Sequence, residues 1–342
     1  MGVKIGPLIK EKGVGREIDV KFLEGKIIAI DALPTIYEML AVIRAKNGDY
    51  LRDSKGRITS HLVGLFNRTA RMLAHGIKPI FVFDGPPHPL KIHELERRKK
   101  IKEEARKKLE EAKKRGDIDA IIKYAKQSME ITDQVLGSAI ELLKLFGVPI
   151  IIAPHDAEAQ CAYIVKKGDA YATASPDFDS FLYGSPRVIQ NLKMSTTKFT
   201  PILYELKEVL EKLGLTYEQL VDMAILIGTD FNPGGVRGVG PKRAYELIRQ
   251  YKSLERVLKV IRWEWKVPAE EIKKVFLNPS VTDNYKIEFK DPDYDGIIEF
   301  LVEEHDFNQQ RVKKELEDVK RRLEKEKKIG VRRQVSLEAF FG

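Results

Sequence analysis

The sequence predicts an α/β protein with a mostly parallel central sheet flanked by helices. Three observations support this fold class: short apolar runs recur along the chain, amphipathic stretches separate them, and acidic residues follow them. The strongest runs cover residues 26–30, 79–83 and 148–152, and a weaker run covers 169–174. Apolar runs rich in β-branched residues are typical of buried strands, and strands that alternate with helices favour a parallel sheet.

Two stretches between the predicted strands have apolar residues at helical spacing. They cover residues 59–75 and 132–146. Both should pack one apolar face against the sheet. In parallel α/β sheets, ligands bind beyond the carboxyl ends of the strands, and the acidic residues fall there.

Residues 91–131 interrupt this alternation, because the stretch is dense in Lys, Arg and Glu with few apolar residues. It predicts one or two mostly solvated helices. The ordinary interpretation is a surface helical hairpin. The alternative is a basic excursion that stands over a site, since the stretch leaves the predicted sheet shortly after Asp84.

Composition limits the class of protein. The chain has 342 residues, a net charge of +9 and a single cysteine. One cysteine excludes an internal disulfide and fits a reducing compartment. There is no signal-peptide pattern and no apolar run near the roughly 18 residues of a membrane span. We therefore expect a soluble, cytoplasmic protein with no membrane partner, and the basic balance favours a polyanionic one.

Seven acidic residues stand out at or after the predicted strands and near the glycine-rich segment. They are Asp31, Asp84, Asp156, Glu158, Asp177, Asp179 and Asp230. A single Asp after a strand usually caps a helix or a turn. Several carboxylates at one edge of a sheet, however, cannot all stay ionised without cations. Mg²⁺ and Mn²⁺ prefer oxygen ligands, and two such ions form the clamp used for in-line phosphoryl displacement.

Two acidic pairs, Asp156 with Glu158 and Asp177 with Asp179, have the spacing i, i+2. On an extended segment such side chains share a side, so each pair can offer two carboxylates to one metal region. No His/Cys group has zinc spacing. His155 lies between the candidate ligands in sequence, and we expect it to face solvent.

A glycine-rich turn at residues 234–244 precedes a helical pattern at 245–254. Successive amides that open a helix form an anion-binding nest, and Lys242 and Arg243 add positive charge there. An ordinary connection between two helices is the alternative. A dinucleotide-binding loop is disfavoured, because no strand precedes the glycines. The spacing suits a duplex phosphate backbone that is bound without sequence preference.

The last residues, 326–342, begin in a charged run and end in two phenylalanines. We interpret them as a flexible tail that carries a short linear motif at 334–341.

Together these motifs resemble the flap endonuclease family of structure-specific 5′ nucleases, especially its archaeal members. The resemblance covers essentially the whole chain, and its motifs are weak singly but specific in this order. They are Asp31-Ala-Leu-Pro-Thr-Ile-Tyr37, Thr59-Ser60-His61-Leu62, Phe83-Asp84-Gly85, Ala153-Pro154-His155-Asp156-Ala157-Glu158-Ala159-Gln160, Ala174-Ser175-Pro176-Asp177-Phe178-Asp179-Ser180, Ile227-Gly228-Thr229-Asp230, the glycine turn and the tail.

The resemblance implies an enzyme, a metal-dependent hydrolase that cuts DNA at the base of 5′ flaps in replication, including Okazaki fragment maturation, and in repair. A 5′–3′ exonuclease activity and a 5′-phosphate product are also implied. The cofactors would be two Mg²⁺ ions held by the seven carboxylates, with Mn²⁺ able to substitute, and K⁺ at the glycine turn. The partners would be branched DNA with a 5′ single-stranded flap and a sliding clamp, and we expect a monomer.

The resemblance also assigns roles to individual residues. Residues 87–131 would form a helical arch, with Lys91 and Arg98 near the scissile phosphate, and Tyr37 would stack on a nucleobase. The remaining assignments are, for DNA binding, Gly2, Arg44, Arg68, Gly235, Gly238, Gly240, Lys242 and Arg243, and, for clamp binding, Gln334, Leu337, Phe340 and Phe341.

One position departs from the family, which usually has Glu where this chain has Asp156. A side chain shorter by one methylene reaches less far, so we expect Asp156 to orient a metal-bound water instead of binding the metal directly.

The resemblance further divides the chain into a nuclease domain at 1–325 and the tail at 326–342. Within the domain, an N-terminal region (about 1–98) and an internal region (about 132–260) flank the arch, and a helix–turn–helix DNA-binding motif occupies 234–255. The alternatives are a 5′ exonuclease or repair-bubble endonuclease of the same superfamily, an RNase with a related carboxylate sheet, and a non-catalytic clamp-tethered DNA-binding protein.

Overall fold

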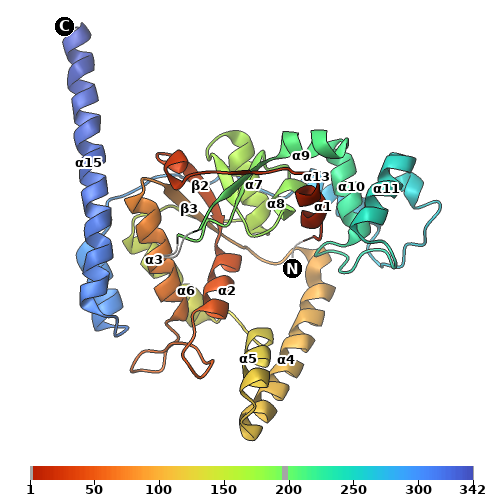
Figure 1. Ribbon diagram of the computed structural model, residues 1–342, viewed down its shortest axis with the longest axis horizontal. Helices are drawn as coiled ribbons and strands as arrows, with labels where there is room; N and C mark the ends of the chain where they lie inside the picture. The colour runs from red at the N-terminus through yellow and green to blue at the C-terminus, as the bar shows by residue number, and fades with distance from the viewer. Residues whose placement is uncertain (1–2, 195–198, 342) are drawn as a thin grey trace.

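A computed structural model describes residues 3–194 and 199–341, and it confirms the mostly parallel sheet (Figure 1). The sheet has seven strands in the order β1-β7-β6-β5-β2-β3-β4. The strands are β1 (Arg16–Glu17), β2 (Ile27–Asp31), β3 (Lys78–Phe83), β4 (Ile150–Ile152), β5 (Ala172–Ala174), β6 (Arg187–Gln190) and β7 (Ile202–Glu205). Strands β2 to β6 pair in parallel, whereas β7 pairs antiparallel with β6 and with β1.

Four predicted strands are confirmed, although the strand after Val148 starts only at Ile150 and the weak run forms only Ala172–Ala174. Strands β1, β6 and β7 were not predicted. They have two to four residues each, which is too short for a periodic pattern to be recognised.

Helices cover both faces of the sheet. Those of the first half are α1 (Gly6–Glu11), α2 (Ala32–Val42), α3 (Ser60–Ala74), α4 (Ile92–Arg115), α5 (Ile118–Gln127), α6 (Asp133–Leu145), α7 (Ala157–Lys167) and α8 (Asp179–Leu182). Those of the second half are α9 (Leu206–Leu213), α10 (Tyr217–Ile227), α11 (Pro241–Tyr251), α12 (Leu254–Val257), α13 (Ala269–Leu277), α14 (Tyr294–Ile298) and α15 (Gln309–Phe341). The two predicted amphipathic helices are confirmed as α3 and α6.

The core explains this arrangement. One apolar cluster joins the sheet to α2, α3, α6 and α15, and another joins it to α8, α10 and α11. Strand β2 is buried at the centre of the sheet between β3 and β5. The carboxyl ends of β2, β3 and β5 are therefore held together by packed, buried neighbours, which is what a precise site requires.

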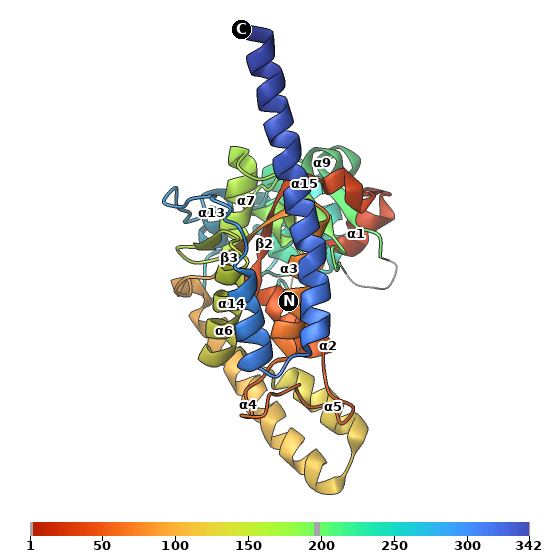
Figure 2. The ribbon, with the colours of Figure 1, turned by 90° about the vertical axis from the view of Figure 1, so that its left-hand side faces the viewer.

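The charged stretch forms the helical hairpin α4–α5, as predicted. It projects from the body at one end of the molecule in both views (Figures 1 and 2). Gly116, with φ of 69°, makes the turn between the two helices, because this left-handed conformation favours glycine.

The C-terminal segment, for which the sequence predicts a tail with a linear motif, is helical. Helix α15 continues without interruption to Phe341, and its last turns extend beyond the body (Figure 2). The segment is rich in Lys, Arg and Glu, which favour helix, and the pair Arg322–Glu326 at 2.9 Å has i, i+4 spacing. Within the described part of the chain, no helix is apolar enough over a sufficient length to cross a membrane.

Candidate functional site

The acidic residues lie where the sheet and its helices present them. Asp31 ends β2, Asp84 follows β3, Asp156 and Glu158 begin α7, Asp177 follows β5, Asp179 begins α8, and Asp230 follows α10. Because β2, β3 and β5 run parallel and are adjacent, these side chains reach the same edge of the sheet.

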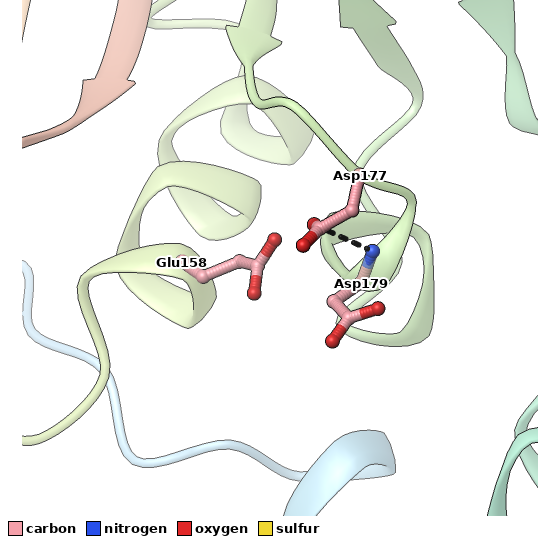
Figure 3. A group of neighbouring side chains, drawn as sticks. All are labelled: Glu158, Asp177 and Asp179. Atoms are coloured by element: carbon pink, nitrogen blue, oxygen red, sulfur yellow. Dashed lines mark hydrogen bonds between the residues drawn. The ribbon is translucent and has the colours of Figure 1, made fainter. Parts of the chain in front are cut away.

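Glu158, Asp177 and Asp179 form a cluster that could hold a metal ion. One carboxylate oxygen from each lies within 4.8 Å of the other two. Glu158 comes from α7, whereas the two aspartates come from the loop after β5 and the start of α8, so three carboxylates converge from two elements (Figure 3). Each is partly buried, which limits screening by water.

Each carboxylate of this cluster is oriented by a neutral donor. Ser180 donates its hydroxyl to Glu158 at 2.8 Å, Ser175 donates to Asp177 at 3.1 Å, and the amide of Val3 donates to Asp179 at 2.7 Å. Neutral donors fix the oxygens without neutralising the charge. The cluster thus keeps the negative charge that attracts a divalent cation.

The electrostatics of the cluster favour protonation in the absence of a cation. Burial, together with Asp177 and Asp179, raises the pKa of Glu158 well above its usual range. Burial and the neighbouring Asp177 raise the pKa of Asp179 to about 7. A bound cation would remove this repulsion, so the ionised cluster and a metal ion stabilise each other.

Asp31 gives an independent sign that a cation fits here. Its Oδ1 atom is buried without a hydrogen-bond partner among the residues that the structure describes. Burial and Asp84 raise the pKa of Asp31 well above its usual range. Asp84 is anchored by the amide of Ala157, which donates to it at 2.6 Å. An unpaired buried carboxylate oxygen is costly, and a metal ion would satisfy it.

The other two predicted ligands are paired with cations at the base of the arch. Lys91 Nζ lies 2.6 Å from Asp156 Oδ1 and 3.8 Å from Asp230, and Arg98 lies 2.5 Å from Asp230. Burial alone would lower the pKa of Lys91, but Asp156 and Asp230 raise it. The sequence predicted these residues at one site, and the structure brings the two cations directly onto the two carboxylates.

The arch also contacts the predicted stacking residue. Lys102 donates from Nζ to the hydroxyl of Tyr37 at 3.3 Å and lies 5.5 Å from the centre of its ring. Tyr37 belongs to α2, so this contact joins α2 to α4. The ring of Tyr37 therefore lies against α4 of the arch.

The glycine turn opens α11, but the helix begins at Pro241, earlier than the predicted 245. Proline fits the first position of a helix, where no amide is needed. Gly235 has φ of 61°, and a side chain there would collide with the backbone of Leu226 and Ile227. The turn thus packs against the end of α10 and depends on glycine at this position.

The two basic residues after the turn are accessible to a polyanion. The side chains of Lys242 and Arg243 are 79% and 58% exposed, and their acidic partners lie at 3.6 and 3.3 Å. Exposed pairs of this length contribute little to stability, so the cations are free to exchange partners.

The remaining DNA-binding candidates are engaged locally. Arg44 donates to the carbonyl of Gly48 at 3.0 Å and lies over the ring of Tyr50, and Arg68 pairs with Glu38 at 2.8 Å. Gly2 lies outside the described residues. The backbone of the clamp-binding candidates Gln334, Leu337, Phe340 and Phe341 lies in α15, and their side chains fall outside the described ones.

His155 does not simply face solvent as expected. It is half-buried, its Nδ1 lies 2.7 Å from the carbonyl oxygen of Pro86, and its ring lies against His88 at 5.2 Å. These contacts join the start of α7 to the segment that leads into the arch.

Three residues near the site were not predicted. Glu94 pairs with Arg98 at 2.7 Å, Tyr183 donates to Asp156 at 3.3 Å, and Trp265 donates to the carbonyl of Gly235 at 2.8 Å. The spacing i, i+4 from Glu94 to Arg98 is a signal in the sequence, whereas Tyr183 and Asp156 are 27 residues apart and leave none. The contact of Trp265 joins distant segments and leaves no such signal.

Comparison with known proteins gives consistent results along the whole chain. Residues 1–105 match the XPG N-terminal domain, and residues 147–230 match the XPG I-region. The chain is 48% identical to flap endonuclease 1 of Staphylothermus marinus, over the full length of both.

Comparison with solved structures also finds flap endonucleases among the proteins with a similar fold. Flap endonuclease-1 from Methanococcus jannaschii has a TM-score of 0.76 and 42% identity, with 95% of this chain and 100% of that chain covered. The catalytic core of Rad2 in complex with DNA substrate has a TM-score of 0.74 at 23% identity, with 93% and 100% covered, and this likeness concerns the fold alone.

Proposed function

This chain belongs to the flap endonuclease family of metal-dependent DNA nucleases, and on that premise we propose that it hydrolyses DNA at the base of 5′ single-stranded flaps. The observation that carries the proposal is the partly buried cluster of Glu158, Asp177 and Asp179. The basic arch reaches the same group of carboxylates, because Lys91 contacts Asp156 and Arg98 contacts Asp230. Buried acids without cationic partners suit a metal centre, and a basic arch suits a nucleic-acid strand.

We assign the seven carboxylates to a centre for two Mg²⁺ ions. Glu158, Asp177 and Asp179 would bind a metal ion directly. Asp31, at the end of β2, would add its Oδ1 atom, which has no hydrogen-bond partner among the described residues. When bound, divalent ions supply charge neutralisation of the phosphate and an activated water. Asp156 and Asp230 would act mainly through the arch cations that they already contact.

Lys91 and Arg98 would stabilise the negative charge that develops on the phosphate. Lys91 contacts Asp156 and Arg98 contacts Asp230 at the start of α4. Glu94 fixes the direction of Arg98 through a contact at 2.7 Å. For these two cations to meet a phosphate, they exchange a carboxylate partner for it. Such groups act in the transition state more than in binding.

The glycine turn would hold the DNA duplex at a distance from the carboxylates that bind the metal ions. The amides and exposed cations of the glycine turn, with Lys242 and Arg243, provide phosphate contacts without base recognition. K⁺ could bind at carbonyl oxygens of the same turn. The carbonyl of Gly235 already accepts the indole N–H of Trp265, which fixes the loop for either ligand.

The C-terminal part of α15 would bind a sliding clamp. Helix α15 extends beyond the body, and Gln334, Leu337, Phe340 and Phe341 lie on its last turns (Figure 2). Apolar and aromatic residues on a projecting segment suit a partner's pocket. Deletion from Arg332 onward should abolish clamp binding and spare cleavage without the clamp. Loss of basal cleavage would instead show that the segment serves the nuclease itself.

A cleavage assay tests the main proposal and its alternatives. With Mg²⁺, the protein should cut a 5′-flap substrate faster than gapped, bubble or single-stranded DNA, and Asp179→Ala should stop cleavage. DNA affinity of that variant should stay within roughly tenfold, because phosphate contacts supply most of it. Preference for the bubble would favour the repair-type enzyme, and cleavage by Asp179→Ala at the normal rate would refute the metal assignment.

A further inference from the structure

Tyr183 contacts the acidic site although no motif includes it. Asp156 has one partner on each carboxylate oxygen: Lys91 lies 2.6 Å from Oδ1, and the hydroxyl of Tyr183 donates to Oδ2 at 3.3 Å. An ionised carboxylate is only an acceptor, so the phenol is the donor in this pair. Asp156 is therefore held from two directions, by one cation and by one neutral group.

The two partners of Asp156 come from different parts of the fold. Tyr183 directly follows α8, is only 7% exposed, and packs its ring on Phe276 with the ring centres 5.0 Å apart. Lys91, in contrast, lies at the beginning of the projecting hairpin. The hydroxyl of Tyr183 is thus presented by the packed core, whereas the ammonium belongs to the arch.

The geometry points to Tyr183 as a positioning residue that holds the shortened carboxylate of Asp156 in place when Lys91 turns to the phosphate. This inference rests on the proposed function, because it takes Asp156 as part of the metal centre. A phenol is protonated at neutral pH, so the hydroxyl of Tyr183 keeps donating to Asp156. Without it, Asp156 would lose its remaining protein partner among the described side chains whenever Lys91 leaves.

Tyr183 and Asp156 also fit each other in size. The hydroxyl lies 3.3 Å from Oδ2, so a carboxylate that is longer by one methylene would have to meet this hydroxyl or turn away from it. Tyr183 is buried, and buried neighbours respond to a single added methylene. A glutamate at position 156 should therefore be tolerated better when residue 183 lacks the hydroxyl.

The experiment compares Tyr183→Phe, Asp156→Glu and the double variant. Mn²⁺ binding to the DNA-free protein is measured by electron paramagnetic resonance, and single-turnover cleavage is measured separately. Tyr285→Phe is the matched control, because Tyr285 donates to Asp169 at 2.6 Å, before the start of β5 and away from the acidic site. Tyr285→Phe also removes a hydrogen bond from a tyrosine hydroxyl to an aspartate, but this bond lies outside the metal centre.

We expect Tyr183→Phe to weaken Mn²⁺ binding by about three- to tenfold, as for the loss of one hydrogen bond to a charged group. The cleavage rate should fall with it, the KM for flap DNA should not change, and Tyr285→Phe should leave both unchanged. Asp156→Glu alone should weaken Mn²⁺ binding by about tenfold, and adding Tyr183→Phe should restore part of the loss.

Three results would overturn the inference. They are normal Mn²⁺ binding by Tyr183→Phe, an equal loss in the Asp156 and Asp156→Glu backgrounds, and loss of the fold in Tyr183→Phe, which would make the hydroxyl a packing group. Failure of the proposed function is separate, because it would show as cleavage by Asp179→Ala. If Asp179→Ala is inactive and Tyr183→Phe binds Mn²⁺ normally, only the role of Tyr183 is wrong.

Discussion

Cations gather over aromatic rings at the amino ends of the parallel strands, whereas acidic side chains crowd together at the carboxyl ends. At the amino ends, Lys26 lies 4.4 Å from the ring of Phe22 and 5.2 Å from that of Tyr171, and Arg187 lies 4.5 Å from the ring of Tyr171. At the carboxyl ends, Glu158 and Asp179 lie close together, and the donors on their oxygens among the described residues are neutral.

The two edges thus differ in whether the charge is compensated. A cation over a ring is stabilised by the protein itself and needs nothing further. A buried cluster of acids raises the pKa of its members and destabilises the fold unless a cation arrives. Sites that bind and react are drawn from such uncompensated groups.

The largest effect should come from the acidic cluster. Asp177→Asn and Asp179→Asn keep the shape of the side chain and remove the charge, so each should lower the rate by more than about 100-fold. Asp156→Asn should cost only about 10–100-fold, as expected of a group that acts through a partner. Single-turnover rates at saturating Mg²⁺ test this order, and equal losses for the three variants would contradict it.

The arch cations should come next. Lys91→Ala and Arg98→Ala should each lower the single-turnover rate by about 10²–10³-fold, because these groups act on charge that develops in the transition state. The Kd for flap DNA should change by much less. Lys242→Ala is a matched control at the glycine turn, where binding should weaken and the rate of bound DNA should not. Parallel losses of rate and affinity at Lys91 would make it a simple phosphate anchor.

The stability of the metal-free protein should depend on pH through the same cluster. The pKa of Asp179 rises from an ordinary 3.8 to about 7 in the fold, so the folded state binds more protons than the unfolded state between these values. Its contribution to the free energy of unfolding therefore falls as the pH rises from about 4 to 7. Buried His61, with a pKa lowered to about 3, acts in the opposite direction below pH 6.5.

The variant Asp179→Asn separates the contribution of Asp179 to the pH dependence of stability from that of His61. At pH 8 without metal it should be more stable than the natural chain, by on the order of 1–4 kcal/mol, and at pH 4 the difference should vanish. Mg²⁺ should stabilise the natural chain more than the variant. Urea unfolding at several pH values measures this, and a difference that does not depend on pH would contradict the assignment.

The sequence alone could predict that acidic residues lie at the carboxyl ends of the parallel strands. The apolar runs that form the strands, and the acidic residues that follow them, can be recognised from short stretches of sequence. The run that ends at Asp31 and the run before Asp84 are long, buried and β-branched, so their carboxyl ends were identifiable. The charged hairpin was equally clear from its composition. The resemblance added the assignment of roles, which no periodicity could supply.

The remaining features depend on tertiary contacts. Strand β7 is only four residues long and pairs antiparallel at the far side of the sheet, which no local pattern indicates. The bond from Trp265 to Gly235 joins segments 30 residues apart, and the bond from Tyr183 to Asp156 joins segments 27 apart. Residues 326–341 continue α15, as the helix propensity of their Lys, Arg and Glu residues favours.

The smallest effect should come from the amino ends of the parallel strands, where cations lie over aromatic rings. Lys26→Met keeps an unbranched side chain of similar length over the rings of Phe22 and Tyr171 and removes only the charge. A partly exposed cation–π contact is worth about 0.5–1 kcal/mol, which in a chain of this size should lower the Tm by less than about 3 °C. Cleavage and Mn²⁺ binding should stay unchanged, because Lys26 precedes β2 and the acidic cluster follows it. A clear loss of cleavage in Lys26→Met, measured beside Asp179→Asn, would show that the amino edge also takes part in function and that the contrast between the two edges is wrong.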